Sequence, residues 1–446
     1  MSVSYLDLLN KFRTHKVYKR SAFVSGFKFL VLAFVWFLII YGATASVTFL
    51  IAGILPKILT NFGFVKAAEI VSSLGPIALV MVLIPANATF LVLNERKILA
   101  LLTVRFGPNR VGPDGFLQTV ADAIKLLFKE DVTPKNADKM LFSLAPVIFF
   151  APGTIAFIPL LAVAAGNTGA FISCDLSIGV LFILAVSSIP VIGLVLGGWA
   201  SNNKYSLMGG LRSAAQAISY EIPMVLTVIS VILLTGSINL TEINNNQAGG
   251  LLHWNIFGFG SLPLLLNLFP LGKSSLIGLY GLALVGIGFV LLCIYLISAI
   301  AEVNRIPFDL PEAESELVSG YNTEYTGMKF ALFFLAEYTA LFVICLLAVV
   351  LFLGGGHLPI SIEAEKSILD SLSSVNMFGE VANLSWLLPS IVLMLKAYAI
   401  VFVTVWVRAT LPRLRYDQLL TFSWKFLIPL SLVNIFVVAV LVSLKF

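Results

Sequence analysis

Charged residues are scarce in this sequence. Lys, Arg, Asp and Glu make up only 11% of its 446 residues, whereas hydrophobic residues make up 59%. A typical soluble domain has about 25% charged residues, so this composition excludes an ordinary water-soluble protein. The apolar residues stand in long runs without the alternation of a β-barrel, and about 20 of them cross a bilayer as one helix. The sequence therefore predicts an all-α fold, a polytopic transmembrane helical bundle.

Cysteine and histidine are also scarce, with three of each. The cysteines, Cys174, Cys293 and Cys345, lie far apart and show no CxxC spacing, which argues against a zinc or iron–sulfur site. The sequence also lacks a P-loop, a dinucleotide-binding fingerprint, a nucleophile elbow and a pair of haem-ligating histidines. We therefore expect no metal centre on this chain, and we expect that it neither carries electrons nor binds a nucleotide alone.

Apolar runs and their breakers predict nine membrane spans. They cover approximately residues 27–55, 70–94, 140–164, 177–200, 217–237, 276–300, 331–354, 385–407 and 426–446. The first follows a basic segment, as in a secretory signal, but it is too long for one and lacks a convincing cleavage site. We interpret residues 1–69 as a basic leader with an added transmembrane helix, and residues 70–446 as the main transmembrane domain.

The distribution of basic residues predicts the orientation of the spans. Of the 28 Lys and Arg residues, 22 fall in the N-terminal segment and the even-numbered loops, and five fall on the opposite side. By the positive-inside rule, the basic side faces the cytoplasm or its organellar equivalent. The loops on that side are 95–139, 201–216, 301–330 and 408–425. The outer loops 238–275 and 355–384 show no charge pattern, and we assign them no chemistry.

Three charged residues lie inside predicted spans: Glu221, Glu337 and Lys396. A charge at the centre of a bilayer costs about 2.5 to 3.5 kcal/mol on insertion scales, so such residues usually face a bundle interior or a water-filled path. We interpret these charges as marks of an ion pathway. A purely structural pairing stays open for any one of them.

The loop after the sixth span is rich in carboxylates. Its acidic residues are Glu302, Asp309, Glu312, Glu314, Glu316 and Glu324. A solvated loop can hold many acids at little cost, but Arg305, Phe308 and two prolines are interleaved here and shape the segment. With Glu221 and Glu337, these residues are candidates for an acidic path into the bilayer. Crowded carboxylates in a low dielectric titrate as coupled groups and exchange protons near neutral pH, as a proton relay requires.

The loop 95–139 is basic and contains two Gly-Pro turns, followed by an amphipathic stretch at 115–131. One interpretation of this stretch is a surface helix that binds anionic lipid. The polar candidates of this loop are Glu95, Arg96, Arg105 and Asp122. Further arginines on the same side are Arg212, Arg305 and Arg408. Arginines in such loops can also bind carboxylates of a partner protein or a polar ligand headgroup.

Four segments of the chain resemble a known family of membrane proteins. They are ERKILALLTVRFGPNRVGPDGFLQTVADAIKLLFKE from residue 95, GGWASNNKYSLMGGLRSAAQAISYE from residue 197, AEVNRIPFDLPEAESELVSGYNTEYTGMKFALFFLAEY from residue 301 and WVRATLPRLRYDQLL from residue 406. From about residue 70 to 446 the sequence is similar to the membrane subunit called H in bacteria and subunit 1 in mitochondria. That subunit is part of complex I, the proton-translocating NADH:quinone oxidoreductase.

The resemblance implies a subunit that joins the peripheral arm to the membrane arm, forms much of a quinone-binding chamber and couples quinone reduction to proton translocation. Its substrate would be a quinone, either ubiquinone or menaquinone, and NADH, FMN and iron–sulfur clusters would be held by partner subunits. The implied partners are the peripheral-arm quinone-site and terminal iron–sulfur subunits, small membrane subunits next to the antiporter-like subunits, and membrane lipid, with no nucleic acid. The implied location is the bacterial cytoplasmic membrane or, alternatively, the mitochondrial inner membrane.

The charge pattern and the resemblance together assign the candidate site residues. For the catalytic proton relay they are Glu221, Glu302, Glu312, Glu314, Glu316 and Glu337. For the quinone path or the docking face they are Glu95, Arg96, Arg105, Asp122, Arg212, Arg305, Asp309, Glu324 and Arg408. The first span and the long outer loops depart from the family, and we expect the loops to make lineage-specific contacts.

Two other functions stay open. A secondary transporter or channel would also have buried charges, but it would usually show internal repeats, and the loops 95–139 and 301–330 differ in sign and composition. The homologous subunit of a membrane-bound hydrogenase or of a ferredoxin-linked plastid-type complex would share this scaffold. The segments GPNRVGP and FDLPEAESELVSGYNTEY favour the NADH-linked branch, although the electron donor is bound by other subunits.

Overall fold

The computed structural model describes Thr60 and residues 65–103, 105–112, 115–165, 175–257, 274–311, 317–373, 375–377, 380–382 and 387–443. The chain divides into two compact units, Met1–Arg110 and Val111–Phe446, and each is described by itself. Two predictions lie outside the described residues: the first span at 27–55, and the relay candidates Glu312, Glu314 and Glu316.

The first unit contains one long helix, α4 (Val65–Leu102). Between Glu69 and Glu95 it carries no charged residue, so its middle part has the composition of a membrane span. This part coincides with the predicted span at 70–94. The helix then continues for two turns through the polar residues Glu95 and Arg96.

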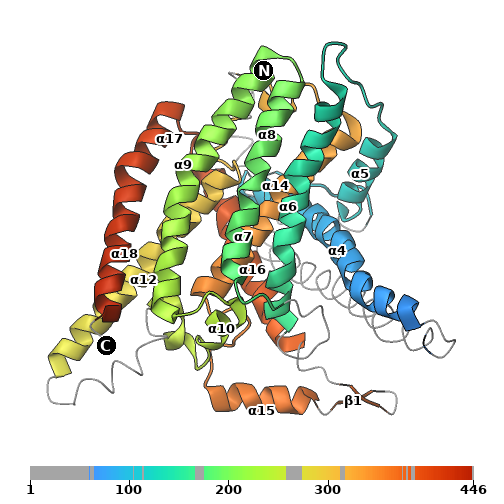
Figure 1. Cartoon of the computed structure of the whole chain (residues 1–446). Helices are drawn as coiled ribbons and strands as arrows, with labels where there is room; N and C mark the ends of the chain where they lie inside the picture. Colours follow the sequence, from blue (N-terminus) through green and yellow to red (C-terminus); the bar gives the residue numbers. More distant parts are fainter. Residues whose placement is uncertain are drawn as a thin grey trace, which may run out of the picture. The chain divides into compact units, whose positions relative to one another are not determined.

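The second unit is a bundle around the helix α14 (Gly327–Phe352). This helix is apolar on all sides, and every residue from Leu341 to Phe352 is buried, as expected for a helix with neighbours all around it. It packs against α6 (Lys139–Ala165), α12 (Ser274–Glu302) and α16 (Leu387–Thr410). Figure 1 shows this bundle along its length.

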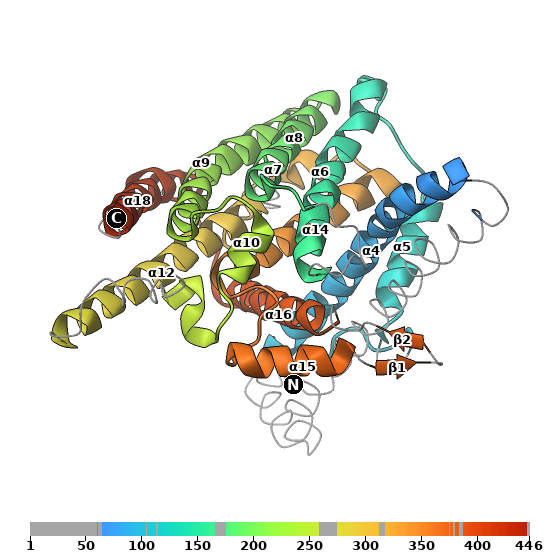
Figure 2. The ribbon, with the colours of Figure 1, turned by 60° about the horizontal axis from the view of Figure 1, so that its bottom comes forward.

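The helices α7 (Gly179–Ser187), α8 (Ile189–Ala200) and α9 (Lys204–Thr235) form one side of the bundle. In both views α8 runs between α6 and α9 (Figures 1 and 2). Glycines permit this close approach: a Cβ atom added to Gly198 would lie 2.6 Å from the Ser206 carbonyl oxygen, and one added to Gly193 would lie 2.8 Å from the Phe149 nitrogen.

The C-terminal part of the chain forms a further long helix against α9. It consists of α17 (Tyr416–Phe422), a π-helical turn η8 (Ser423–Leu427) and α18 (Ile428–Ser443). Both α12 and α18 pack against α9, and they also contact each other (Figure 2).

The predicted all-α membrane fold is confirmed. Within the described residues, six helical stretches are long and apolar enough to cross a membrane, and Gly286–Glu302 is a shorter apolar helix. The six are Lys139–Leu160, Gly179–Ala200, Lys204–Thr235, Gly327–Phe352, Leu388–Thr410 and Tyr416–Ser443. The number of nine spans stays a prediction.

The parts of the four basic loops that belong to the second unit meet at one end of it. The backbone N–H of Val132 donates to the Thr326 hydroxyl (3.0 Å), the Asn202 side chain donates to the Asn136 carbonyl (3.3 Å), and the Leu414 N–H donates to the Pro307 carbonyl (3.1 Å). We call this end the basic end. Within the second unit, the described residues of these loops therefore lie together, as predicted for loops on one side. The helix α5 (Gln118–Phe128) and the turn η7 (Gly320–Asn322) belong to this end.

The outer loops hold short elements that the sequence did not predict. They are α10 (Leu240–Asn245), η4 (Leu251–His253), η5 (Asn255–Phe257), α15 (Ile362–Ser373), β1 (Val375–Met377) and β2 (Glu380–Ala382). The two strands pair antiparallel, with Asn376 opposite Val381. This small hairpin is an exception within an otherwise helical fold.

Candidate functional site

The turn that ends α12 orients the start of the acidic loop. Asn304 has a left-handed backbone (φ 53°), which Asn tolerates better than most residues. Its N–H donates to the Ala301 carbonyl and the Arg305 N–H donates to the Ile300 carbonyl, both at 3.2 Å. These two bonds form a Schellman motif. The motif stops the helix directly after Glu302 and sends the chain back along the bundle.

Gln216 of α9 holds this turn in place. Its fully buried side-chain NH₂ group donates to the Ala301 carbonyl (2.8 Å) and the Phe308 carbonyl (2.7 Å), and lies 3.1 Å from the Asn304 side-chain oxygen. Residues 301–308 are thereby attached to α9 at both of their ends. The Phe308 ring also packs on Tyr220 of α9, with ring centroids 5.5 Å apart.

Two carboxylates, Glu302 and Glu337, line one small cavity of about 60 Å³. Asn304 and Ser187 also line it, and its other walls are mostly apolar residues of α6, α8, α9 and α14. One water molecule needs roughly 10–15 Å³ of such space, so the cavity has room for a few. The Glu302 Oε2 atom is shielded from solvent and has no hydrogen-bond partner among the described residues. An unsatisfied buried oxygen next to a cavity of this size is a typical place for ordered water.

Glu337 lies on α14 and accepts a hydrogen bond of 2.7 Å from the Tyr321 hydroxyl. Both side chains are buried. The next residue of the helix, Tyr338, presents its ring to Arg305, whose guanidinium carbon lies 4.0 Å from the ring centroid. This cation–π contact places a positive charge beside the acidic cavity.

Glu221 on α9 is half-buried and is close enough to Glu302 for their negative charges to repel each other. We call Glu221, Glu302 and Glu337 the acidic triad. The three residues come from three different helices, and the fold brings them together as the sequence analysis expected. Gln216 and Tyr321 are part of the site but were not among the residues predicted from the sequence. Tyr321 stands in the quoted segment SGYNTEY, but nothing in that segment indicates a carboxylate sixteen residues later as its partner.

The other described candidates of the second unit do not line the cavity. Asp309 pairs with Arg413 (3.1 Å), the Arg212 guanidinium lies 5.8 Å from the Tyr416 ring, and Asp122 accepts from Gln118 within α5 (3.2 Å). Arg408 is in the last turn of α16. The remaining three, Glu95, Arg96 and Arg105, belong to the first unit.

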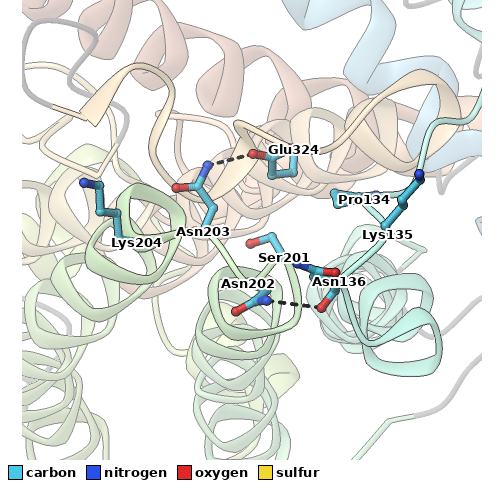
Figure 3. A pocket seen from close by; sticks show the side chains of 8 residues that line it. All are labelled: Pro134, Lys135, Asn136, Ser201, Asn202, Asn203, Lys204 and Glu324. Carbon is cyan, nitrogen blue, oxygen red and sulfur yellow. Dashed lines mark hydrogen bonds between the residues drawn. The ribbon is translucent and has the colours of Figure 1, made fainter.

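Glu324 lines an open pocket of about 530 Å³ at the basic end (Figure 3). The pocket lies between residues 134–136, the turn 201–204 and Glu324, and Lys135 and Lys204 stand on opposite edges of it. Asn203 has two roles here. Its oxygen accepts from the Tyr205 N–H (3.0 Å) as the N-cap of α9, and its NH₂ group donates to the Glu324 carboxylate (2.6 Å).

Comparison with known proteins gives consistent matches over most of the chain. A family model described as NADH dehydrogenase matches residues 75–439. The NADH-quinone oxidoreductase H subunit of Geobacillus thermodenitrificans is 45% identical over 372 residues, which are 83% of this chain and 94% of that protein. The H subunit of Brevibacillus brevis is 44% identical over 367 residues (82% and 91%). One H subunit of Koribacter versatilis, numbered 2, is 41% identical over 397 residues (86% and 100%).

Proposed function

Because the chain belongs to the NADH dehydrogenase family, we propose that it forms part of the quinone-binding chamber of complex I and couples quinone reduction to proton translocation. The chain is a multi-pass membrane subunit of an NADH-quinone oxidoreductase, an enzyme whose full active site it does not hold alone. Other complex I subunits are its partners. Its relatives are bacterial, so its membrane is the bacterial cytoplasmic membrane.

The observation that carries the proposal is that two carboxylates of the acidic triad, Glu302 and Glu337, line one cavity large enough for water. Glu221, the third, lies near Glu302. Ionisable residues at membrane depth are costly and usually mark a pathway for ions or protons. Two carboxylates that share one cavity influence each other's proton affinity, so a proton taken up at one changes the charge at the other. Such a pair can pass a charge change from one helix to the next.

In the proposed mechanism, Glu302 acts at the start of the acidic loop and Glu337 acts inside the bundle. Quinone reduction consumes protons, and the residues of this chain supply and replace them through the loop that contains Glu302. A proton gained or lost at Glu302 then changes the proton affinity of Glu337 across the cavity and of Glu221 on α9. The quinone is the substrate, and FMN and iron–sulfur clusters on partner subunits would supply the electrons.

The basic end is proposed to dock the peripheral arm, with the pocket beside Glu324 as one contact. Lys135 and Lys204 edge this pocket, and two lysines flanking polar side chains suit an acidic side chain of a partner protein. We also propose that residues 1–69 are an added N-terminal segment. The start of the family match at residue 75 supports this division.

The experiment that tests the function replaces Glu302 or Glu337 by Gln in the assembled complex. We expect both variants to assemble and to lose most proton pumping, since the neutral amide cannot take up or release a proton. The measurements are NADH:quinone reductase activity and proton uptake in sealed vesicles. Glu363→Gln, an exposed acid on α15, is the matched control. Full activity and full pumping in both cavity variants would show that the proposal is wrong.

A further inference from the structure

We propose that Tyr321 is a positioning residue for the Glu337 carboxylate, and that a contact with Gly209 of α9 holds Tyr321 in place. The inference rests on the proposed function, because it concerns how one carboxylate of the acidic triad is oriented. It extends the site beyond the acidic triad to two uncharged residues, Tyr321 and Gly209.

The hydrogen bond between these side chains is direct and buried. The Tyr321 hydroxyl donates to the Glu337 Oε1 atom at 2.7 Å, Tyr321 has no exposed surface, and Glu337 is 7% exposed. A hydrogen bond to a carboxylate stabilises its ionised form and is among the stronger kinds in a protein interior. Glu337 is therefore held in one orientation at the edge of the cavity that it shares with Glu302.

The Tyr321 ring has little freedom to move. It packs edge-on against Phe149 of α6 (centroids 6.4 Å apart, planes at 61°) and at a tilt against Phe333 of α14 (5.4 Å, 57°). These aromatic contacts belong to a cluster that also includes Phe142 and Tyr325. Because the ring is enclosed on two sides, the hydroxyl group keeps its direction toward α14.

The backbone of Tyr321 lies directly on α9, and only a glycine fits there. A Cβ atom added to Gly209 would come within 2.8 Å of both the Gly320 Cα atom and the Tyr321 nitrogen. Both of these atoms are backbone, so the clash could be relieved only by moving the turn η7. Gly320 itself has a positive φ of 57°, a conformation that residues with side chains rarely adopt. The position of the phenol is thus set by α9, more than a hundred residues earlier in the sequence.

The consequence for proton transfer is geometric. A proton moves between groups only when they lie within hydrogen-bond reach of one another or of one shared water. Without the Tyr321 hydroxyl, the Glu337 side chain keeps its charge but loses the hydrogen bond that orients its Oε1 atom. A misplacement of about 1 Å at a reacting group can slow a step by roughly a hundredfold.

The test uses the complete enzyme with Tyr321→Phe, which removes one oxygen atom and keeps the ring. We expect normal assembly and proton pumping reduced by roughly ten- to hundredfold. We also expect the carboxyl C=O band of Glu337, identified by its absence in Glu337→Gln, to shift to higher wavenumber in the infrared difference spectrum. Gly209→Ala should shift the same band, although it touches neither carboxylate.

Tyr325→Phe is the matched control. Tyr325 lies in the same aromatic cluster and stacks on Phe142 at 4.1 Å, but its hydroxyl donates to the backbone carbonyl of Gly197 over 3.4 Å. Burial raises the pKa of its phenol above the usual value, so it stays neutral. Its loss should leave both pumping and the Glu337 band unchanged.

The outcomes separate the inference from the proposed function. If Glu337→Gln abolishes pumping while Tyr321→Phe leaves both pumping and the band unchanged, the inference is wrong and the proposed function stands. If Glu337→Gln pumps normally, the inference is wrong, and pumping by Glu302→Gln then decides the proposed function. If Tyr321→Phe does not assemble, Gly209→Ala decides: an unchanged Glu337 band in that variant would overturn the inference.

Discussion

At the scale of single residues, Lys396 shows how backbone carbonyl groups can accept hydrogen bonds from a charged side chain in an apolar helix. Its ammonium group donates to the carbonyls of Leu353 (2.7 Å), Gly355 (3.0 Å) and His357 (2.7 Å), just beyond the end of α14. It also lies 4.1 Å from the centre of the Trp254 ring. A cation at a helix C-terminus binds carbonyls that have no partner within the helix. This geometry favours the structural pairing that the sequence analysis left open for Lys396.

We expect Lys396→Met to destabilise the protein. The methionine fills similar space but leaves up to three carbonyls without their donor, and an unsatisfied buried polar group costs about 1–3 kcal/mol. The measurement is the apparent unfolding temperature of the purified complex and the amount of this chain in membranes. Lys366→Met, at an exposed lysine of α15, is the control. Equal stability of the two variants would contradict this role of Lys396.

At the scale of elements, the start of α9 depends on one side chain. Asn203 caps the helix with its oxygen and binds Glu324 with its nitrogen. Replacing an N-cap Asn by Ala costs about 1 kcal/mol, whereas Ser is a good substitute. We therefore expect Asn203→Ala to be less stable than Asn203→Ser by about 1 kcal/mol in thermal unfolding. If both variants were destabilised equally, the loss of the Glu324 contact, and not of the cap, would be the cause.

The long helices could be predicted from the sequence, and the contacts between them could not. Runs of apolar residues locate α6, α9 and α14 because the bilayer imposes a minimum length on every span. Glu221, Glu302 and Glu337 stand out in the sequence because charge is rare in such helices. Their partners do not stand out. Tyr321 and Gln216 are ordinary polar residues until the fold places them against Glu337 and the Asn304 turn.

The short elements of the outer loops escaped prediction for a related reason. A helix of twelve residues such as α15 is marginal by itself in water. Here a contact of 3.1 Å between His357 and Glu365 attaches α15 to the segment after α14. The hairpin of β1 and β2 has three residues in each strand, and a two-stranded hairpin alone is marginally stable at best. Such elements form through tertiary contacts that a local sequence pattern does not reveal.

At the scale of the whole molecule, the basic end and the outer loops are expected to face opposite sides of the membrane, so a water-soluble reagent should reach them from opposite compartments. The basic end gathers four loops with an excess of Lys and Arg, so it is expected to face the cytoplasm. Its pocket beside Glu324 is proposed to be covered by the peripheral arm. The helix α15 belongs to an outer loop and is expected to face the opposite compartment, where the arm is absent.

A cysteine-labelling experiment tests orientation and docking together. In a Cys174→Ser background, Lys135→Cys marks the pocket and Lys366→Cys marks α15, and both lysines can be replaced without touching the acidic triad. With a membrane-impermeant thiol reagent on inside-out vesicles, we expect Lys135→Cys to react only after the peripheral arm has been stripped off, because the docked arm covers the pocket. Lys366→Cys should react only in right-side-out vesicles. Reaction of Lys135→Cys in the intact complex would rule out the pocket as a docking contact, and reaction of Lys366→Cys in inside-out vesicles would contradict the predicted orientation.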